Sequence, residues 1–167
     1  MKFSIPTSIL IETLNINRPL TSNKSNHHNF FIEVNDKELI ITSTDGERFI
    51  TTRKTRDDCE ILSTGSVCVS SRILDSVLKT LSGDITLEVI NNHKSGQMLS
   101  IMRGSGTIYS NHNSVFTLVT SPTNSFPVSP KNEYESSIVI PSDVLSKIIS
   151  KTFYCVSIDE TRTILNS

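Results

Sequence analysis

The stretch FSIPTSILIETL, residues 3–14, alternates apolar and polar residues up to a proline and then spaces its apolar residues for a helix. Period-two alternation predicts a strand with one buried face, and apolar residues at i, i+1, i+4 and i+5 predict an amphipathic helix. The pattern returns in VCVSSRILDSVL, residues 67–78, and in IVIPSDVLSKII, residues 138–149. We therefore expect three copies of one unit, each a strand followed by a helix.

Each of the first two copies is followed by β-rich segments that are broken by turn residues. The alternation predicts strands near residues 30–34, 38–44 and 48–52, then near 85–90, 98–102 and 115–120, with an extra hairpin around 104–106. One unit cannot cover its own sheet and helix, whereas two units related by a pseudo-twofold axis can share a core. The expected class is α+β, with two repeats per domain, each a βα unit followed by antiparallel strands.

The sequence also contains residues that are typical of helix starts and of domain borders. Pro6 and Pro141 suit the first turn of a helix, and Ser8, Ser71 and Ser142 lie where a hydroxyl could cap it. Residues 1–120 are predicted to form the first domain. Residues 121–137, rich in Pro, Ser, Thr and Asn, are predicted to be a linker. Residues 138–167 are then a truncated start of a second domain, which we expect to be poorly ordered or held only by docking on its neighbour.

Composition restricts the function. The 16 Lys and Arg residues nearly balance 17 Asp and Glu residues, for a net charge of −1, so any nucleic acid must be held by locally placed cations. The three cysteines form no CxxC pair and predict reduced thiols. No run approaches the roughly 18 apolar residues of a membrane span, and the first residues lack the apolar core of a signal peptide. We expect a soluble, cytoplasmic protein.

Several short motifs occur in a characteristic order. They are MKFSI at residues 1–5, TSTD at 42–45, LVTSPTNSFP at 118–127, and a run from 149 to 166 that carries Lys151-Thr152, Asp159-Glu160, Arg162 and Leu165-Asn166. Together they resemble the bacterial replicative sliding clamp, the beta subunit of DNA polymerase III. The chain departs from the family pattern at residues 23–29, 163–164 and 167.

This resemblance implies a DNA clamp fold and a DNA-binding protein without catalytic activity. Such a fragment of a processivity factor would belong to a ring that encircles duplex DNA and tethers the replicative polymerase without reading sequence. In the full-length family the partners are DNA, the DNA polymerase III holoenzyme and the clamp loader. We do not expect this truncated chain to form the family's homodimeric ring. The alternative is a degenerate or repurposed clamp-fold domain that associates with proteins through an exposed edge strand.

A sliding protein should contact phosphates through Lys and Arg, because these contacts carry no base information. Arg72 and Lys79 on the second predicted helix, and Lys147 and Lys151 on the third, lie opposite the apolar stripes. They are candidate DNA-binding residues, although solvated helix faces are an open alternative. The resemblance favours Arg72, Lys79 and Arg162, and by position it adds Lys24 and Arg18, which follow the first predicted helix.

The resemblance also assigns Phe116 to the subunit interface, with a place in the strand core as the alternative.

The pair His27-His28 is not a predicted metal site, because adjacent residues on an extended segment point to opposite sides. The run Gly104-Ser105-Gly106 is not followed by a predicted helix, so it is not a phosphate-binding loop. We expect no cofactor, no metal and no active site.

Overall fold

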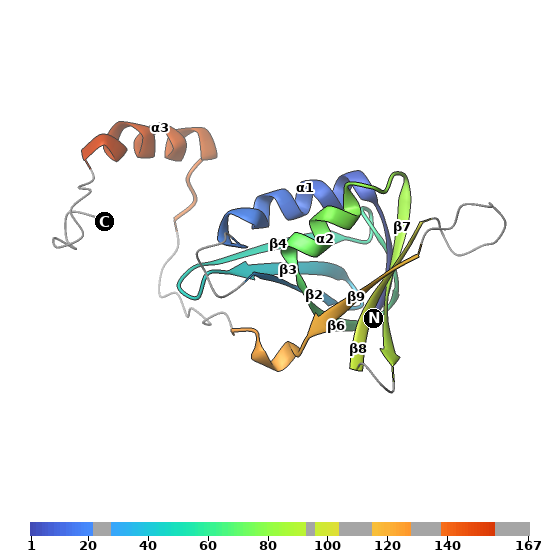
Figure 1. Ribbon diagram of the computed structural model, residues 1–167. Helices are drawn as coiled ribbons and strands as arrows, with labels where there is room; N and C mark the ends of the chain where they lie inside the picture. The colour runs from blue at the N-terminus through green and yellow to red at the C-terminus, as the bar shows by residue number, and fades with distance from the viewer. Residues whose placement is uncertain (22–27, 93–95, 104–114, 128–137, 156–167) are drawn as a thin grey trace. The chain divides into compact units, whose positions relative to one another are not determined.

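The computed structural model describes residues 1–21, 28–92, 96–103, 115–127 and 138–155 (Figure 1). The chain divides into two compact units, Met1–Ser129 and Pro130–Ser167. The first unit holds the two repeats that were expected to share a core. The second holds the third copy of the unit.

Within the described residues, the first unit contains one nine-stranded antiparallel sheet and two α-helices. All six strands predicted between residues 30 and 120 are present, with ends shifted by three residues or fewer. The predicted hairpin at 104–106 lies outside the described residues. The elements are β1 (Lys2–Pro6), α1 (Thr7–Asn17), the 3-10 helix η1 (Arg18–Thr21), β2 (Asn29–Val34), β3 (Glu38–Thr44), β4 (Phe49–Thr55), β5 (Glu60–Ser63), β6 (Gly65–Ser70), α2 (Ser71–Leu78), β7 (Asp84–Asn92), β8 (Gly96–Arg103), β9 (Val115–Ser121) and the 3-10 helix η2 (Thr123–Ser125).

The strand order shows that the two repeats exchange their first strands. The order is β4-β3-β2-β6-β9-β8-β7-β1-β5. The run β4-β3-β2-β6 therefore has the same plan as the run β9-β8-β7-β1. The first strand of each repeat pairs with the second strand of the other repeat, since β6 pairs with β2 and β1 pairs with β7. Neither repeat completes its own half of the sheet.

The exchange is symmetric down to single residues. Phe3 faces Leu87 across β1 and β7, and Val67, its equivalent 64 positions later, faces Ile32 across β6 and β2. The backbone N–H of Thr7 donates to the carbonyl of Gly83 at 2.9 Å, and the equivalent N–H after β6 donates to the carbonyl of His28 at 2.8 Å. The predicted pseudo-twofold relation between two repeats is confirmed.

The core lies between the sheet and the two helices, which run on the same face of it (Figure 1). Leu10 and Leu14 of α1, and their equivalents Leu74 and Leu78 of α2, are at most 1% exposed. The prediction that Ile73 shares this buried stripe is wrong, because its side chain is 50% exposed. At eight residues, α2 buries only the narrow stripe that meets the sheet.

The cap predictions also need correction. Pro6, Ser70 and Pro141 are the residues that precede the three helices, and none of these helices has a side-chain cap hydrogen bond. In α1 the carbonyl of Gly83 instead accepts hydrogen bonds from the backbone N–H of Thr7 at 2.9 Å and from the Thr7 hydroxyl at 2.7 Å. The tertiary neighbour thus takes the place that a local cap was expected to fill.

Strand β5 was not predicted, and it is where the symmetry breaks. In the second repeat, the end of β9 pairs with β6 at Cys68 and Val69. The equivalent strand β4 ends at Thr55 before it could reach β1, and β5 pairs with β1 instead. Among the described residues, β5 has no counterpart in the second repeat, so the repeat pattern did not predict it.

The start of the predicted linker contacts the first unit. β9 continues to Ser121, and the ring of Phe126 stacks on the ring of Phe31 of β2, with centroids 5.1 Å apart. The domain borders at residues 120 and 137 stay predictions.

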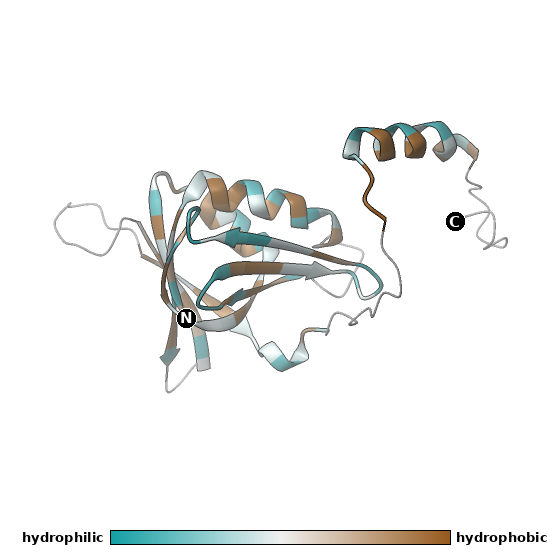
Figure 2. Ribbon diagram, turned by 180° about the vertical axis from the view of Figure 1, so that it is seen from behind, coloured by the Kyte–Doolittle hydropathy of each residue, from teal (hydrophilic) through white to brown (hydrophobic). Residues whose placement is uncertain are grey.

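The second unit contains the predicted third helix, α3 (Ser142–Thr152), followed by the short 3-10 helix η3 (Phe153–Cys155). Figure 2 shows hydrophobic residues along α3 and on the segment before it. None of the residues of α3 is buried. Its apolar stripe is therefore exposed. The stripe consists of Val144, Leu145, Ile148 and Ile149, which are 41–52% exposed.

Candidate nucleic-acid interface

The outward face of α1 and α2 carries two of the cations that were predicted to bind DNA, Arg72 and Lys79. Arg72 and Lys79 of the α2 segment are both exposed, and Asp75 lies between them at helical spacing. Leu74 and Leu78 point the other way, into the core. The narrow buried stripe of α2 therefore fixes which residues of this helix face solvent. We call this outward surface of α1 and α2 the helix face.

A buried polar network fixes the end of α1. The side chain of Asn17 is fully buried, and its amide donates to the hydroxyl of Thr52 at 2.6 Å and to the carbonyl of Thr13 at 3.0 Å. The hydroxyl of Ser43, from the TSTD motif, donates to the backbone carbonyl of Asn17 at 2.8 Å. These bonds join α1 to β3 and β4. The next residue, Arg18, is thereby placed at the C-terminal end of α1.

Arg18 and Lys79 both form ion pairs with the carboxylate of Asp75. Asp75 Oδ1 accepts a hydrogen bond from the guanidinium of Arg18, and Asp75 Oδ2 forms an ion pair with Lys79 Nζ at 2.7 Å. The side chain of Asp75 is 21% exposed, whereas those of Arg18 and Lys79 are 47% and 63% exposed. The carboxylate lies low between the two helices, and both cations reach solvent beyond it.

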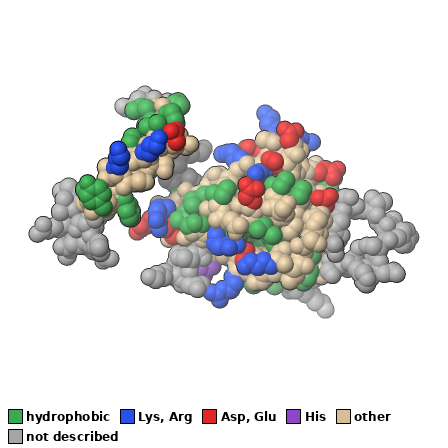
Figure 3. All heavy atoms as spheres, turned by 90° about the horizontal axis from the view of Figure 1, so that it is seen from above, with side chains coloured by type: hydrophobic (Ala, Val, Ile, Leu, Met, Phe, Trp, Pro, Cys, Tyr) green, Lys and Arg blue, Asp and Glu red, His purple; other side chains and the backbone are tan. Residues whose placement is uncertain are grey.

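The helix face mixes charge with exposed apolar side chains. Figure 3, which looks onto it, shows Lys and Arg side chains interspersed with Asp, Glu and hydrophobic side chains. The exposed apolar residues include Ile16 of α1 and Ile73 of α2, each about half exposed. Three cations, Arg18, Arg72 and Lys79, outnumber the carboxylates of Glu12 and Asp75. This balance suits weak attraction to a polyanion, not tight binding.

The other four predicted DNA-binding residues, Lys24, Lys147, Lys151 and Arg162, do not belong to α1 or α2. Lys147 and Lys151 lie on α3 in the second unit, where both are exposed, and Lys147 pairs with Asp143 at 3.8 Å. Lys24 and Arg162 lie outside the described residues. Asp75 was not among the residues predicted for the site. Its contact with Arg18, 57 positions away, had no signal in the sequence.

Phe116 takes a place in the sheet. It is partly buried against the core and faces Ile101 of β8. On the opposite side of β9, Val115 and Val119 are 55% and 69% exposed. Among the described residues, Val115–Val119 pair only with β8. The pairing of β9 with β6 involves Thr120 and Ser121 alone. The other edge of this segment has no strand partner within the part of the chain that the structure describes, and a role of Phe116 at a subunit interface stays a prediction.

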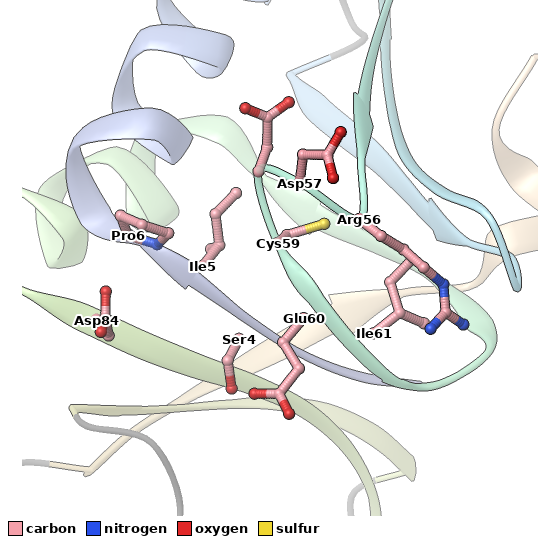
Figure 4. Close-up of a pocket in the computed structure, with 10 residues that line it drawn as sticks. Ser4, Ile5, Pro6, Arg56, Asp57, Cys59, Glu60, Ile61 and Asp84 are labelled. Atoms are coloured by element: carbon pink, nitrogen blue, oxygen red, sulfur yellow. The ribbon is translucent and has the colours of Figure 1, made fainter.

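A pocket of about 400 Å³ marks the symmetry break beside β5. Figure 4 shows Ser4, Ile5 and Pro6 of β1 on one side of it, with Cys59 and Glu60 among the residues opposite. The Cys59 thiol is buried and donates to the carbonyl of Thr55, and burial raises its pKa. A thiol that stays protonated is a poor nucleophile. The neighbouring carboxylate of Asp58 raises the pKa of this thiol further.

Two further features are absent from the described residues. They contain no group of three or more His, Cys, Asp or Glu side chains arranged to hold a metal ion. They also contain no helix that is long and apolar enough to cross a membrane.

Comparison with known proteins now identifies the family. Residues 1–130 match the family model described as DNA polymerase III beta subunit, N-terminal domain. The chain belongs to this family. The beta sliding clamp of Buchnera aphidicola is 30% identical to it over 99% of this chain and 43% of that protein. The beta sliding clamp of Rickettsia felis is 24% identical over 99% of this chain and 41% of that protein. The chain thus spans about two fifths of the length of the family members it matches.

Solved structures of family members share the fold. The beta subunit from the DNA polymerase of Streptococcus pyogenes aligns with a TM-score of 0.85 at 20% identity, covering 98% of this chain and 42% of that one. The sliding clamp from Bacillus subtilis aligns with a TM-score of 0.84 at 24% identity, with the same coverage. The predicted DNA clamp fold is therefore confirmed.

Proposed function

We propose that this chain is a fragment of a DNA polymerase processivity factor, a non-catalytic clamp that holds duplex DNA through phosphate contacts. The observation that carries the proposal is the match of residues 1–130 to the N-terminal domain of the DNA polymerase III beta subunit. The helix face supports it, because Arg72 and Lys79 are exposed there and Arg18 joins them from α1. In the cell the partners would be duplex DNA, the polymerase holoenzyme and the clamp loader, all in the cytoplasm.

The chemistry of the helix face supports binding without sequence readout. Long, exposed cations contact phosphates and leave base edges unread. With no closed ring around the duplex, a fragment retains only the non-specific phosphate term, with a dissociation constant typically about 10⁻⁴ M or weaker at physiological salt. We expect this chain alone to bind DNA weakly and with strong salt dependence.

Fluorescence anisotropy with a labelled duplex at two low salt concentrations tests the proposal. The double variant Arg72→Ala, Lys79→Ala should weaken binding and lower the slope of log affinity against log salt by about 1 to 2, because each lost phosphate contact removes roughly one unit. The matched control is Lys37→Ala with Arg56→Ala, which removes the same charge from exposed turns beside β3 and β4. Equal losses in both variants, or sequence-selective binding, would contradict the proposal.

A second candidate function rests on the open edge of β9. Val115–Val119 carry no charged residue, whereas Arg53 and Lys54 lie on β4 and Glu60 lies on β5, the two outer strands of the sheet. Charges at sheet edges discourage pairing with other chains, and an uncharged open edge permits it. On this proposal the chain is a repurposed clamp-fold domain that binds an extended strand of another protein chain.

Sedimentation velocity over a range of protein concentrations tests this second function. Val119→Lys adds a charge at an exposed position of β9 and should abolish any association through the edge. Ile90→Lys, at an exposed position of β7, which β8 separates from β9, is the control and should leave the association intact. A chain that is monomeric throughout, or a β9 variant that associates like the wild type, would argue against this function.

A further inference from the structure

We propose that Asp75 acts as an electrostatic brake on DNA binding, by holding Arg18 and Lys79 in ion pairs on the helix face. This inference rests on the proposed DNA-binding function and adds a residue that opposes it. The geometry that carries it is one carboxylate with a cation on each oxygen, Arg18 on Oδ1 and Lys79 on Oδ2. The two cations come from different helices.

The position of Asp75 makes this competition with phosphate direct. Its side chain is less exposed than either partner, so the two cations are more accessible to an approaching duplex than the carboxylate is. Exposed ion pairs are weak, so phosphate can displace the carboxylate. Asp75 is therefore a weak competitor that lowers affinity without blocking the contact.

The carboxylate of Asp75 also lowers the positive electrostatic potential that an approaching duplex meets at the helix face. Each phosphate neutralised by a cation adds roughly 0.9 to the salt slope of binding, and a carboxylate already paired with that cation reduces this gain. A clamp that must move along DNA needs contacts that break readily. Asp75 gives the helix face this property through Arg18 and Lys79, without touching DNA itself.

The test is Asp75→Asn in the full chain, measured by fluorescence anisotropy with the same duplex at several salt concentrations. Asparagine keeps the size of the side chain and removes its charge. We expect binding to tighten about 3- to 10-fold at low salt and the salt slope to steepen by about 1 to 2, as one or two cations are released for phosphate. Asp75→Glu retains the carboxylate and should bind like the wild type.

Glu33→Gln is the matched control for overall charge. Glu33 is exposed on β2, between Ile32 and Val34, which are buried, so its side chain lies on the sheet surface away from the core and helices. If this control tightens binding as much as Asp75→Asn, or if Asp75→Asn binds like the wild type or more weakly, the inference is overturned. Asp75→Asn should also lose its effect when Arg18 and Lys79 are both changed to Gln, as a double-mutant cycle requires.

The outcomes separate this inference from the proposed function. If the wild type does not bind DNA, or if Arg72→Ala with Lys79→Ala leaves binding unchanged, the function itself fails. If that double variant weakens binding while Asp75→Asn does not strengthen it, only the brake fails.

Discussion

At the scale of single residues, Asp45 organises the turn between β3 and β4. Its carboxylate accepts hydrogen bonds from the backbone N–H groups of Glu47 and Arg48, and from the Arg48 guanidinium at 2.6 and 2.9 Å. The backbone bond from Arg48, followed by its side chain, lowers the pKa of Asp45 from 3.8 to about 2. The TSTD motif thus ends in a residue whose charge holds the hairpin turn.

This lowered pKa predicts a specific pH dependence. A depressed pKa means that the charged carboxylate stabilises the fold above pH 3.8, and that this contribution is lost as the pH falls through about 2. Asp45→Asn should therefore be less stable than the wild type at pH 7, with the difference closing towards pH 2. Urea unfolding at several pH values and an NMR titration of the Asp45 carboxyl group measure this. A midpoint near 3.8 in the folded wild type would contradict it.

Asn17 is the second residue whose role depends on its neighbours. Asn17→Ala removes a fully buried amide and leaves the hydroxyls of Thr52 and Ser43 with fewer partners. Loss of such a buried hydrogen-bonding group costs about 1–3 kcal/mol of unfolding free energy. Asn15→Ala, at an exposed position of the same helix, should change the stability by less than about 0.5 kcal/mol. Similar losses in both variants would show that the network contributes nothing.

At the scale of elements, two adjacent residues of α2 show which side of this helix is buried. The adjacent residues Ile73 and Leu74 are both apolar, but Leu74 is fully buried and Ile73 is half exposed. Periodicity alone predicted that both would be buried. A helix that contacts a sheet on one side buries only the residues that face it, and the contact is decided by packing.

Leu74→Ala should destabilise the chain by about 2–5 kcal/mol, because it leaves a cavity in the core. Ile73→Ala should cost under about 1 kcal/mol, because half of its side chain is already in water. Urea unfolding of the two variants gives the comparison, and Leu10→Ala, the equivalent of Leu74 in α1, should behave like Leu74→Ala. A larger loss for Ile73→Ala than for Leu74→Ala would mean that the rotation of α2 is wrong.

At the scale of the whole first unit, the reciprocal exchange of β1 and β6 makes the two repeats interdependent. The first strand of each repeat pairs with the second strand of the other repeat. The buried cluster that results draws on both repeats, with Phe3, Leu10 and Ile32 from the first and Val67, Leu74 and Leu87 from the second. Unfolding of one repeat must therefore expose the core of the other.

This interdependence predicts that fragments 1–64 and 65–129 are each unfolded alone and fold when mixed. Alone, each would lose the partner of its second strand and half of its core. Circular dichroism and NMR spectra of the single fragments and of the equimolar mixture measure the outcome. Independent folding of either fragment would contradict the shared core.

Local patterns in the chain determined the strands, the helices and their repetition, because strand and helix periods are set by backbone geometry and are visible in neighbouring residues. The family motifs were visible for the same reason, since each is a short run of consecutive positions. Tertiary structure alone decided the strand exchange, the insertion of β5 beside β1, the exposure of Ile73 and the meeting of Arg18 with Asp75. Each of these depends on contacts between residues far apart in the chain, and such contacts are selected by packing and charge in the folded state.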